Sequence, residues 1–427
     1  MRNDPRSHGL WETTAPHGPQ YPILNGTHET EVAIIGAGYT GLSTALHLSE
    51  AGMSATVIDA VEPGFGGAGR NVGLVNAGMW VMPKALPDVL GPVYGQRLLE
   101  FLGDAPSEVF SIVRKYDIDC EAVPNGTLHL AVGKAGLQEI TEREAQWKAC
   151  GAPVKLLDAT ETRRRLGGGN YRGALLDCRA GTIQPLSYAR GLAQAAMSHG
   201  ATIYANTPAT KVARENGVWV VTTPNGTLRA RWLIPASDAY TQNVFPEISR
   251  EQVTLPYFNM ATTPLPKDIR ETILPNGEGC WDTREVLSSY RMDRSGRLIF
   301  GSVGRLGAVD FGAHKAWALR AMRRIFPQLE NIEFDHVWWG RIGMTSDHLP
   351  RLHKLGENAL TFCGYNGRGI APGTVFGKAL AKHILGELPE GDMPLPPSDI
   401  RPAALRNAKY AFYAAGSALQ HTVSDRL

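Results

Sequence analysis

The sequence predicts an α/β protein with a discontinuous Rossmann-like domain and a second, β-rich (α+β) domain. Three observations support this fold class: a strand–turn–helix–strand unit at residues 31–59, a second strand–turn–helix unit at residues 358–385, and long β runs between them. Units of this kind build parallel sheets covered by helices. Because the two units lie near opposite ends of the chain, the domain that they share must be interrupted by the other one.

The first unit has the order of a dinucleotide-binding fold. A short apolar strand at residues 32–35 leads into a glycine turn and a helix start, which comprise Gly36, Gly38, Tyr39, Thr40 and Gly41. The first glycine makes the tight turn, the second lets a pyrophosphate approach the backbone, and the third allows the helix to pack on the strand. Asp59 ends the second strand, 18 residues after Gly41, where it can accept a hydrogen bond from a ribose hydroxyl. The unit predicts binding of an adenine dinucleotide.

The loop that follows favours a flavin over NAD. Five glycines fall within residues 64–73, as expected of a backbone that wraps closely around a ligand. An NAD domain usually passes straight into another helix, whereas a flavin's isoalloxazine ring must be held far from its nucleotide. A flexible surface loop is the alternative interpretation. The predicted cofactor contacts in this loop are Gly67, Ala68, Arg70, Asn71, Gly73 and Leu74.

The second glycine unit predicts the other end of the flavin site. A strand at residues 358–364 runs into a glycine turn and then a helix at residues 374–385. The helix N-terminus can stabilise the anionic N1–C2=O edge of a reduced flavin, and Arg368 can add a fixed charge there. The predicted contacts in this turn are Gly367, Arg368, Gly369 and Ile370.

These segments resemble the D-amino-acid-oxidase-like superfamily of FAD-dependent oxidoreductases, over about residues 30–390. The likeness is greatest to the branch of γ-glutamylputrescine oxidase and bacterial L-pipecolate oxidases. It rests on Gly-Phe-Gly-Gly-Ala-Gly-Arg-Asn-Val-Gly at residues 64–73 and Gly-Tyr-Asn-Gly-Arg-Gly-Ile at residues 364–370. The resemblance implies FAD as the cofactor, with the strand that holds Val212 passing the adenine.

The chain departs from the family pattern at three places. Ala68 replaces a serine that helps to bind the cofactor, and Arg368 replaces a histidine close to the flavin's pyrimidine ring. The cysteine that carries covalent flavin in sarcosine oxidase should fall near Gly340 or Arg341, where no cysteine is present. The resemblance therefore implies non-covalent FAD.

The motif positions divide the chain between two domains. The β runs at residues 252–263, 287–291 and 297–303 interrupt the α/β pattern and predict a substrate domain laid over the flavin. We expect an N-terminal arm at 1–29, an FAD-binding domain at 30–90, 151–235 and 336–390, a substrate domain at 91–150 and 236–335, and a proline strap with a C-terminal helix at 391–427.

The sequence offers few candidates for residues that bind the substrate. Arg291 ends a predicted strand and is our candidate to bind a substrate carboxylate with its guanidinium fork, with a solvated strand-end arginine as the alternative and Arg341 as the next candidate. Tyr257 and Phe258 are candidate pocket walls, with core packing equally open. A neutral amine needs no dedicated base, because a flavin takes a hydride from carbon.

Composition argues against several other classes of protein, namely nucleic-acid-binding, disulfide-bonded and metal-binding ones. The chain has 427 residues, 43% hydrophobic and 20% charged, and a net charge of +2, which gives no reason to expect nucleic acid as a partner. Five scattered cysteines without a CxxC pair predict reduced thiols in the cytoplasm, and the twelve histidines show no metal-ligand spacing. The tail at residues 403–420 predicts either a helix docked on the body or on a second subunit, or an amphipathic helix on the inner face of a membrane.

Four functions remain open at this point. The first is an FAD-dependent amine or amino-acid oxidase that acts on a small secondary amine and passes electrons to O2. The second is a flavin dehydrogenase of the same substrates that uses a membrane electron acceptor. An NAD-linked dehydrogenase and a flavin-binding protein without catalysis complete the set. The first is the function that we expect, and the sequence does not choose among L-pipecolate, γ-glutamylputrescine and other N-alkyl amines.

Overall fold

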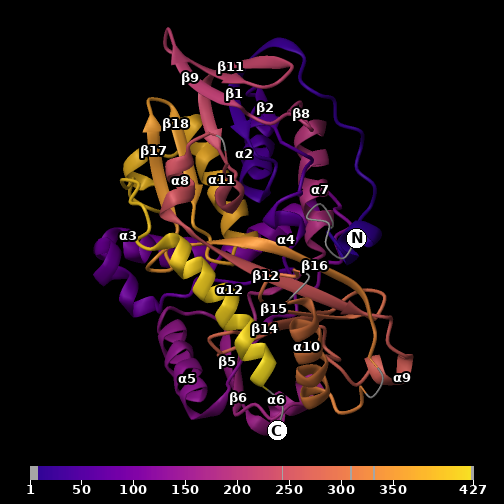
Figure 1. Ribbon diagram of the computed structural model, residues 1–427. Helices are drawn as coiled ribbons and strands as arrows, with labels where there is room; N and C mark the ends of the chain where they lie inside the picture. The colour runs from indigo at the N-terminus through magenta and orange to yellow at the C-terminus, as the bar shows by residue number, and fades with distance from the viewer. Residues whose placement is uncertain (1–7, 243, 308–309, 330–331, 425–427) are drawn as a thin grey trace.

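Two large sheets lie one beyond the other along the length of the molecule (Figure 1). The computed structural model describes residues 8–242, 244–307, 310–329 and 332–424. The first sheet has the order β17-β18-β11-β1-β2-β8, with β10 added to β11 and β9 to β10. Its strands are β1 (Gly26–Ile35), β2 (Ala55–Ile58), β8 (Thr202–Tyr204), β9 (Lys211–Glu215), β10 (Val218–Thr222), β11 (Gly226–Pro235), β17 (Arg351–Gly356) and β18 (Ala359–Cys363).

The middle of the first sheet is parallel, as the glycine units predicted. β1 pairs in parallel with both β2 and β11, and β11 pairs in parallel with β18. The carboxyl ends of β1 and β18, from which the two glycine turns start, therefore meet at one edge. This edge is where open α/β sheets bind their ligands.

The second sheet is mostly antiparallel and has the order β16-β12-β15-β14-β13-β4-β6-β5. Its strands are β4 (Thr127–Leu130), β5 (Val154–Asp158), β6 (Gly173–Asp177), β12 (Val253–Thr262), β13 (Gly279–Asp282), β14 (Ser288–Met292), β15 (Leu298–Val303) and β16 (Phe334–Met344). A small sheet joins β3 (Leu74–Val75) to β7 (Gly181–Thr182). The second sheet takes in β5, β6 and most of β16, which the sequence analysis assigned to the FAD-binding domain. A short β run does not reveal which sheet it joins.

Helices cover both sheets. The long strands β12 and β15 pack against α10, while α2, α7 and α11 lie against the first sheet or one another. Most of α3 and all of α4 lie in the segment 91–150 that the sequence analysis assigned to the substrate domain, but both helices pack on α11. The helices are α1 (Leu10–Thr14), α2 (Tyr39–Glu50), α3 (Leu86–Gly103), α4 (Ala105–Lys115), α5 (Gly133–Ala149), α6 (Ala159–Leu166), α7 (Pro185–Ser198), α8 (Pro246–Glu251), α9 (Lys267–Arg270), α10 (Phe311–Ile325), α11 (Ile370–Ile384) and α12 (Arg406–Val423).

The crossing of α2 and α11 brings the two glycine turns together. A side chain at Gly377 would place its Cβ 2.6 Å from the carbonyl oxygen of Thr40 and 2.7 Å from Cβ of Ser43. The Ser43 hydroxyl donates to the carbonyl oxygen of Thr374 at 2.6 Å across the same contact. Glycine thus allows the two helix backbones to approach closely, and their N-termini end up beside one another.

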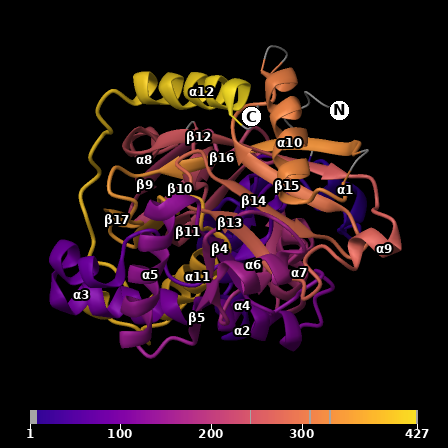
Figure 2. The same cartoon turned by 90° about the horizontal axis from the view of Figure 1, so that it is seen from below.

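The tail is a strap followed by a docked helix. Met393 and Leu395 are buried, and the Ser398 N–H donates to the carbonyl oxygen of Leu352 at 2.8 Å, which fixes the strap along β17. The helix α12 then crosses the second sheet and packs against β12 and α10 (Figures 1 and 2). This is docking on the body of the same chain, one of the arrangements that the sequence left open.

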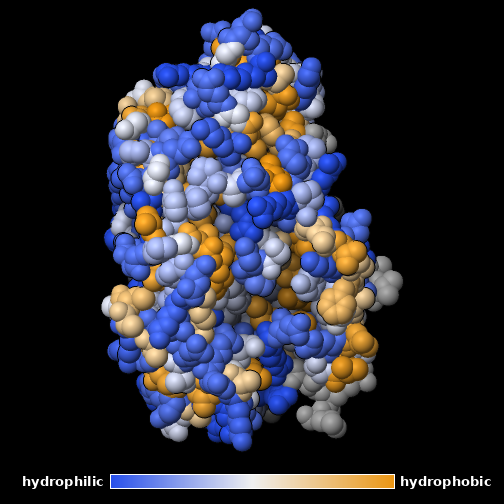
Figure 3. Space-filling view, turned by 90° about the vertical axis from the view of Figure 1, so that its left-hand side faces the viewer, coloured by the Kyte–Doolittle hydropathy of each residue, from blue (hydrophilic) through white to orange (hydrophobic). Residues whose placement is uncertain are grey.

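One face of the molecule is mainly polar. On the face shown in Figure 3, hydrophobic residues form small separate groups among hydrophilic ones. Across the part of the chain that the structure describes, no helix combines the length and the apolar character needed to cross a bilayer.

The α2–α11 contact generates a stability prediction. Replacing Gly377 with alanine forces the two helix backbones apart, and overpacking of this kind costs about 1–3 kcal/mol. We expect Gly377→Ala to lower the urea midpoint of unfolding. Gly416→Ala is the matched control, because Gly416 is also helical but its added Cβ meets nothing within 4 Å. An alanine there should leave stability unchanged or raise it by up to about 1 kcal/mol. Equal effects of the two substitutions would contradict this account.

Candidate functional site

A single cavity of about 860 Å³ joins the carboxyl ends of the first sheet to one face of the second. This volume lies near the upper end of the range of about 300–1,000 Å³ that is usual for small-molecule sites. Both glycine turns line it, together with the loop at residues 65–72 and the inner face of β12. The predicted nucleotide and substrate regions are therefore parts of one continuous space.

Asp59 stands at one end of the cavity, at the tip of β2. Its carboxylate accepts hydrogen bonds from the backbone N–H groups of Ala37 and Val61, both at 2.8 Å. Burial raises the pKa of Asp59, and the two backbone bonds act against that rise. The carboxylate is thus oriented by the glycine turn and still lines the cavity, where a ribose hydroxyl can reach it.

The predicted adenine strand is displaced. Val212 lies in β9 and packs against the core beside the first sheet, and it does not line the cavity. The residues that do so here are Thr207, Pro208 and Ala209, which precede that strand. The prediction for Val212 is therefore wrong by a few residues, because the chain leaves the cavity as it enters β9.

The three glycines of the first turn have three different roles. Gly36 has a φ of +112°, which favours glycine, and a Cβ at Gly41 would lie 2.0 Å from the carbonyl oxygen of Gly36. A Cβ at Gly38 would meet only Cβ of Ala68, at 3.9 Å, and would otherwise project into the cavity. The second glycine thus keeps space for a ligand, while the first and third serve the fold.

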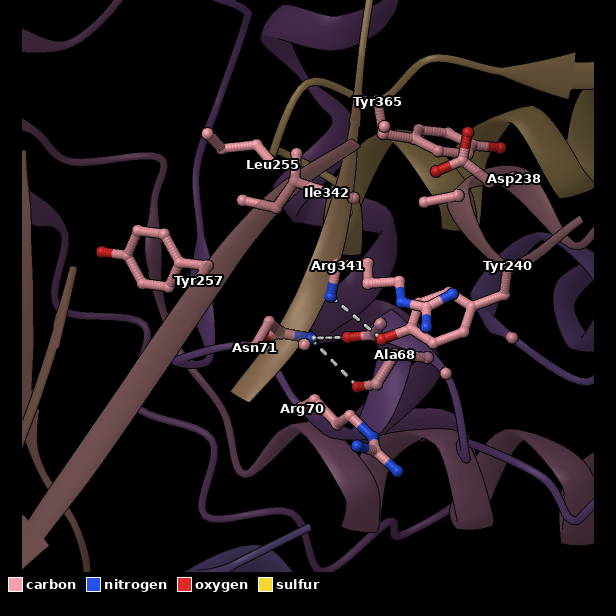
Figure 4. Close-up of a pocket in the computed structure, with 18 of the residues that line it drawn as sticks. Ala68, Arg70, Asn71, Asp238, Tyr240, Leu255, Tyr257, Arg341, Ile342 and Tyr365 are labelled. Carbon is pink, nitrogen blue, oxygen red and sulfur yellow. Dashed lines mark hydrogen bonds between the residues drawn. The ribbon is translucent and has the colours of Figure 1, made fainter. Parts of the chain in front are cut away.

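The loop after Asp59 is held by Asn71. The Asn71 amide donates to the carbonyl oxygen of Ala68 at 3.0 Å (Figure 4). It also donates to the carbonyl oxygen of Gly67 at 3.0 Å, and its own oxygen accepts from the Gly73 N–H at 2.8 Å. Gly73 does not line the cavity; its φ is +88° and a Cβ there would lie 2.1 Å from the carbonyl oxygen of Ile183. The remaining predicted contacts of the loop, with Tyr39 and Thr40 from α2, do line the cavity.

The second turn is fixed by Asn366. Its side-chain oxygen accepts from the Thr345 N–H at 2.8 Å, and its amide donates to the carbonyl oxygen of Gly364 at 2.6 Å. Its carbonyl oxygen accepts from the indole N–H of Trp80 at 2.6 Å. These bonds hold the cavity-lining residues of the turn, which are Gly367, Arg368, Gly369 and Ile370.

Arg368 is a buried cation in an aromatic cage. Its guanidinium lies 4.6 Å from the ring centroid of Trp80 and 4.7 Å from that of Trp281, and the side chain donates to the carbonyl oxygen of Ala77 at 3.2 Å. No carboxylate of the described residues pairs with it, and its Nε has no hydrogen-bond partner. Burial, with a smaller effect of Arg143, lowers the pKa of Arg368 to about 9, so the group stays charged at neutral pH. The cavity therefore has a positive wall that lacks an anion.

The inner face of β12 supplies the opposite wall. Leu255 and Tyr257 line the cavity, and the Tyr257 hydroxyl forms a 2.7 Å hydrogen bond with the hydroxyl of Ser289. Phe258 points the other way and is fully buried against α10, among Trp317 and other core residues. Successive residues of a strand face opposite sides, so only one member of the Tyr257–Phe258 pair can wall the cavity.

The structure contradicts the prediction that Arg291 anchors the substrate. Arg291 is 1% exposed and does not line the cavity. Its guanidinium donates to the carbonyl oxygens of Ile183 and Met292 and lies 3.5 Å from the carboxylate of Glu121. A fork already used by these partners is not available to a substrate carboxylate. The residue stabilises the packing of β14 on the segment before α7.

Arg341, the second candidate, does line the cavity. Its guanidinium lies 5.8 Å from the ring centroid of Tyr240, and its backbone N–H donates to the Tyr240 hydroxyl at 3.0 Å (Figure 4). Tyr240 and Asp238 come from the chain that leaves β11, and the sequence analysis missed both. Burial raises the pKa of Asp238 to about 6, and the Gly364 N–H donates to it at 2.7 Å. The signal that could have found them is their place just after the carboxyl end of a parallel strand.

These features fit FAD. The cavity has the Asp59 carboxylate and a segment of small residues for an adenosine. It has Gly38, where any side chain would occupy the space of the ligand, and two helix N-termini for anionic groups. Among the described residues that line it there is neither a cysteine nor a lysine. Cys363 is the cysteine nearest in sequence to a cavity-lining residue, and it is fully buried in β18.

Comparison with known proteins gives a consistent result. Residues 31–383 match the family described as FAD dependent oxidoreductase. The chain is 33% identical over 387 residues to a probable oxidoreductase OrdL of Rhizobium meliloti (strain 1021), covering 90% of this chain and 89% of that protein. It is 31% identical to gamma-glutamylputrescine oxidoreductase of Escherichia coli (strain K12), covering 86% of each.

Solved structures share the fold. Glycine oxidase from Geobacillus kaustophilus superimposes with a TM-score of 0.68 at 19% identity, over 84% of this chain and 95% of that one. L-proline dehydrogenase from P. horikoshii superimposes with a TM-score of 0.70 at 18% identity, over 87% of this chain and 96% of that one. At this identity the likeness extends to the architecture alone.

The geometry of Gly38 predicts a separation of cofactor binding from folding. Gly38→Val should abolish FAD binding, because the added methyl groups occupy the cavity, while the apoprotein should melt as the wild-type apoprotein does. Gly41→Ala is the contrasting variant and should lower the melting temperature of the apoprotein, since its Cβ collides with backbone. The measurements are flavin absorbance per protein and thermal unfolding of both apoproteins. A yellow, fully loaded Gly38→Val protein would contradict the assignment.

Proposed function

Because the chain belongs to the family of FAD-dependent oxidoreductases, we propose that it oxidises the C–N bond of a small secondary amine or amino acid. The observation that carries the proposal is the single cavity in which both glycine turns meet a chamber walled by Trp80, Trp281 and Tyr257 beside the unpaired Arg368. Relatives named gamma-glutamylputrescine oxidoreductase and glycine oxidase support this substrate class. L-Pipecolate and γ-glutamylputrescine remain the substrates to test first.

For this reaction the protein has to position the substrate carbon near the flavin and to exclude water from the chamber. Bound FAD, held without a covalent link, supplies the acceptor for a hydride from the carbon next to nitrogen. Loss of the hydride from the neutral amine leaves an iminium, which still carries the proton on its nitrogen. That proton passes to water once the product has left the chamber, so no side chain has to act as a base. The aromatic walls exclude water and hold the substrate carbon close to the ring.

Arg368 supplies the electrostatic part. A fixed positive charge in a buried site stabilises negative charge that develops nearby, and it needs no reorganisation at the moment of reaction. The start of α11 lies next to Arg368 in the chain and adds the positive end of its dipole. We assign both to the pyrimidine end of the cofactor.

The role of Arg368 can be tested with two variants. Arg368→Met removes the charge, and we expect the two-electron midpoint potential of bound FAD to fall by roughly 30 mV or more, which corresponds to about 1.4 kcal/mol. Anaerobic reduction by the amine should slow by at least about tenfold. Arg368→Lys keeps the charge and should restore most of the potential. If Arg368→Met instead weakens substrate binding at an unchanged potential, the residue binds the substrate carboxylate.

The electron acceptor is the second part of the proposal. We propose O2, which is reduced to H2O2, because a cation at the cavity wall stabilises the negative charge that develops as oxygen is reduced. The alternative is a dehydrogenase that delivers electrons to a membrane acceptor. It is favoured by the apolar residues that α12 exposes, of which Phe412 and Leu419 are 69% and 67% exposed.

Stopped-flow mixing separates these two acceptors. Protein reduced anaerobically with its substrate is mixed with oxygenated buffer or with an artificial dye, and the return of the yellow absorbance is followed. We expect oxygen to restore it at least as fast as steady-state turnover, with H2O2 formed in equal amount to the imine. Reoxidation by oxygen slower than turnover with the dye would make the dehydrogenase assignment correct.

A further inference from the structure

The C-terminal helix contributes to the cavity wall. Five residues of α12 line the cavity beside the second sheet: Phe412, Tyr413, Gly416, Ser417 and Gln420. The helix lies across β12 and reaches the end of β15 (Figures 1 and 2). These two strands send their paired residues Tyr257 and Val303 into the same cavity. The helix therefore faces the substrate chamber, at a distance in the fold from Asp59 and the nucleotide end.

A small set of polar contacts fixes α12 to the body. His421 is 1% exposed; its ring stacks on Trp317 at 3.8 Å between centroids, and its Nδ1 shares a 2.7 Å hydrogen bond with Nδ1 of His314. The guanidinium of Arg320 donates to the carbonyl oxygen of His421 at 2.7 Å. At the other end of the helix, Arg406 donates to the carbonyl oxygen of Gln252 at 2.8 Å. Contacts at both ends leave the middle of the helix over the cavity.

The helix buries little apolar surface in this contact. Ser417 and His421 are its buried residues, whereas its largest apolar side chains, including Phe412 and Leu419, are mostly exposed. Elements that make few buried apolar contacts open at low free-energy cost. The wall formed by α12 can thus open more readily than the sheets that complete the chamber.

Gly416 marks the point where this wall limits the chamber. A glycine inside an exposed helix is unfavourable relative to alanine, so packing or function has to account for it. Packing does not, because an added Cβ would meet nothing within 4 Å. Because Gly416 has no side chain, it leaves free space at the wall of the cavity.

We propose that α12 is the outer wall of the substrate chamber, and that Tyr413, Gly416 and Gln420 determine how large an amine the chamber admits. The nature of the substrate rests on the function proposed above, whereas the position of the wall does not. The helix separates the cavity from solvent, and the substrate portion farthest from the reacting carbon lies against it. Substitutions on its inner side change access to the cofactor, and substitutions on its outer side do not.

The first experiment adds volume on the two sides of α12 in the full-length holoenzyme. Gly416→Phe directs a ring into the cavity, and Ala415→Phe adds the same ring at an exposed neighbouring position that does not line it. Acrylamide quenching of the flavin fluorescence reports access to the cofactor without any turnover. We expect Gly416→Phe to lower the quenching constant at least twofold and Ala415→Phe to leave it at the wild-type value. Equal quenching in the two variants, with normal FAD content, would overturn the proposal.

A second variant removes volume, so that the test does not depend on a substituted helix that fails to dock. Tyr413→Ala should raise the quenching constant and raise the ratio of kcat/KM for a bulky N-alkyl amine over that for a small one at least fivefold. An unchanged quenching constant and an unchanged ratio would refute the wall. If no amine reduces the cofactor in the wild-type protein, the proposed function fails, and the quenching series still decides the position of the wall.

Discussion

The site depends on the crossing of α2 and α11 at a glycine. Because Gly377 has no side chain, the two helix backbones approach closely enough for the Ser43 hydroxyl to donate to a carbonyl oxygen of α11. Each helix begins with a glycine turn, so the crossing places two sets of free N–H groups and two positive dipole ends at one edge of the sheet. A bulkier residue at the crossing would separate the turns, and the cavity between them would lose its shape.

The second sheet depends on this arrangement in turn. Its long strands β12 and β16 reach the same edge, and Arg341 in β16 donates its N–H to Tyr240, which follows β11 of the first sheet. The alternation along β12 assigns Tyr257 to the cavity and Phe258 to the core against α10. One strand thus serves both the chamber and the stability of the domain that covers the cofactor site.

What the sequence predicted well is local in the chain, and what it missed is not. The glycine turns, the acidic end of β2 and the family follow from residues a few positions apart, whose roles hold wherever the unit lies in the fold. Arg291 is the residue type that binds carboxylates, but its guanidinium is already bound to Glu121 and to the carbonyl oxygen of Ile183, which lie far from it in the chain. The same limit applies to the domain boundaries and to α12, because pairing of distant segments decides which sheet a strand joins and which cavity a helix covers.

The Arg368 cage shows how the fold accommodates a group that does not favour stability. Removing a guanidinium from water is costly, and no carboxylate of the described residues forms an ion pair with it. Trp80 and Trp281 offset part of this cost, since a cation over a desolvated indole face gains about 2 kcal/mol. The lowered pKa of Arg368 shows that a net penalty for the charge remains. A buried charge retained at such a cost, beside a helix N-terminus and open to a cavity, is suited to stabilise negative charge on a ligand, and this requirement explains an arginine at a position where the fold itself gains little from one.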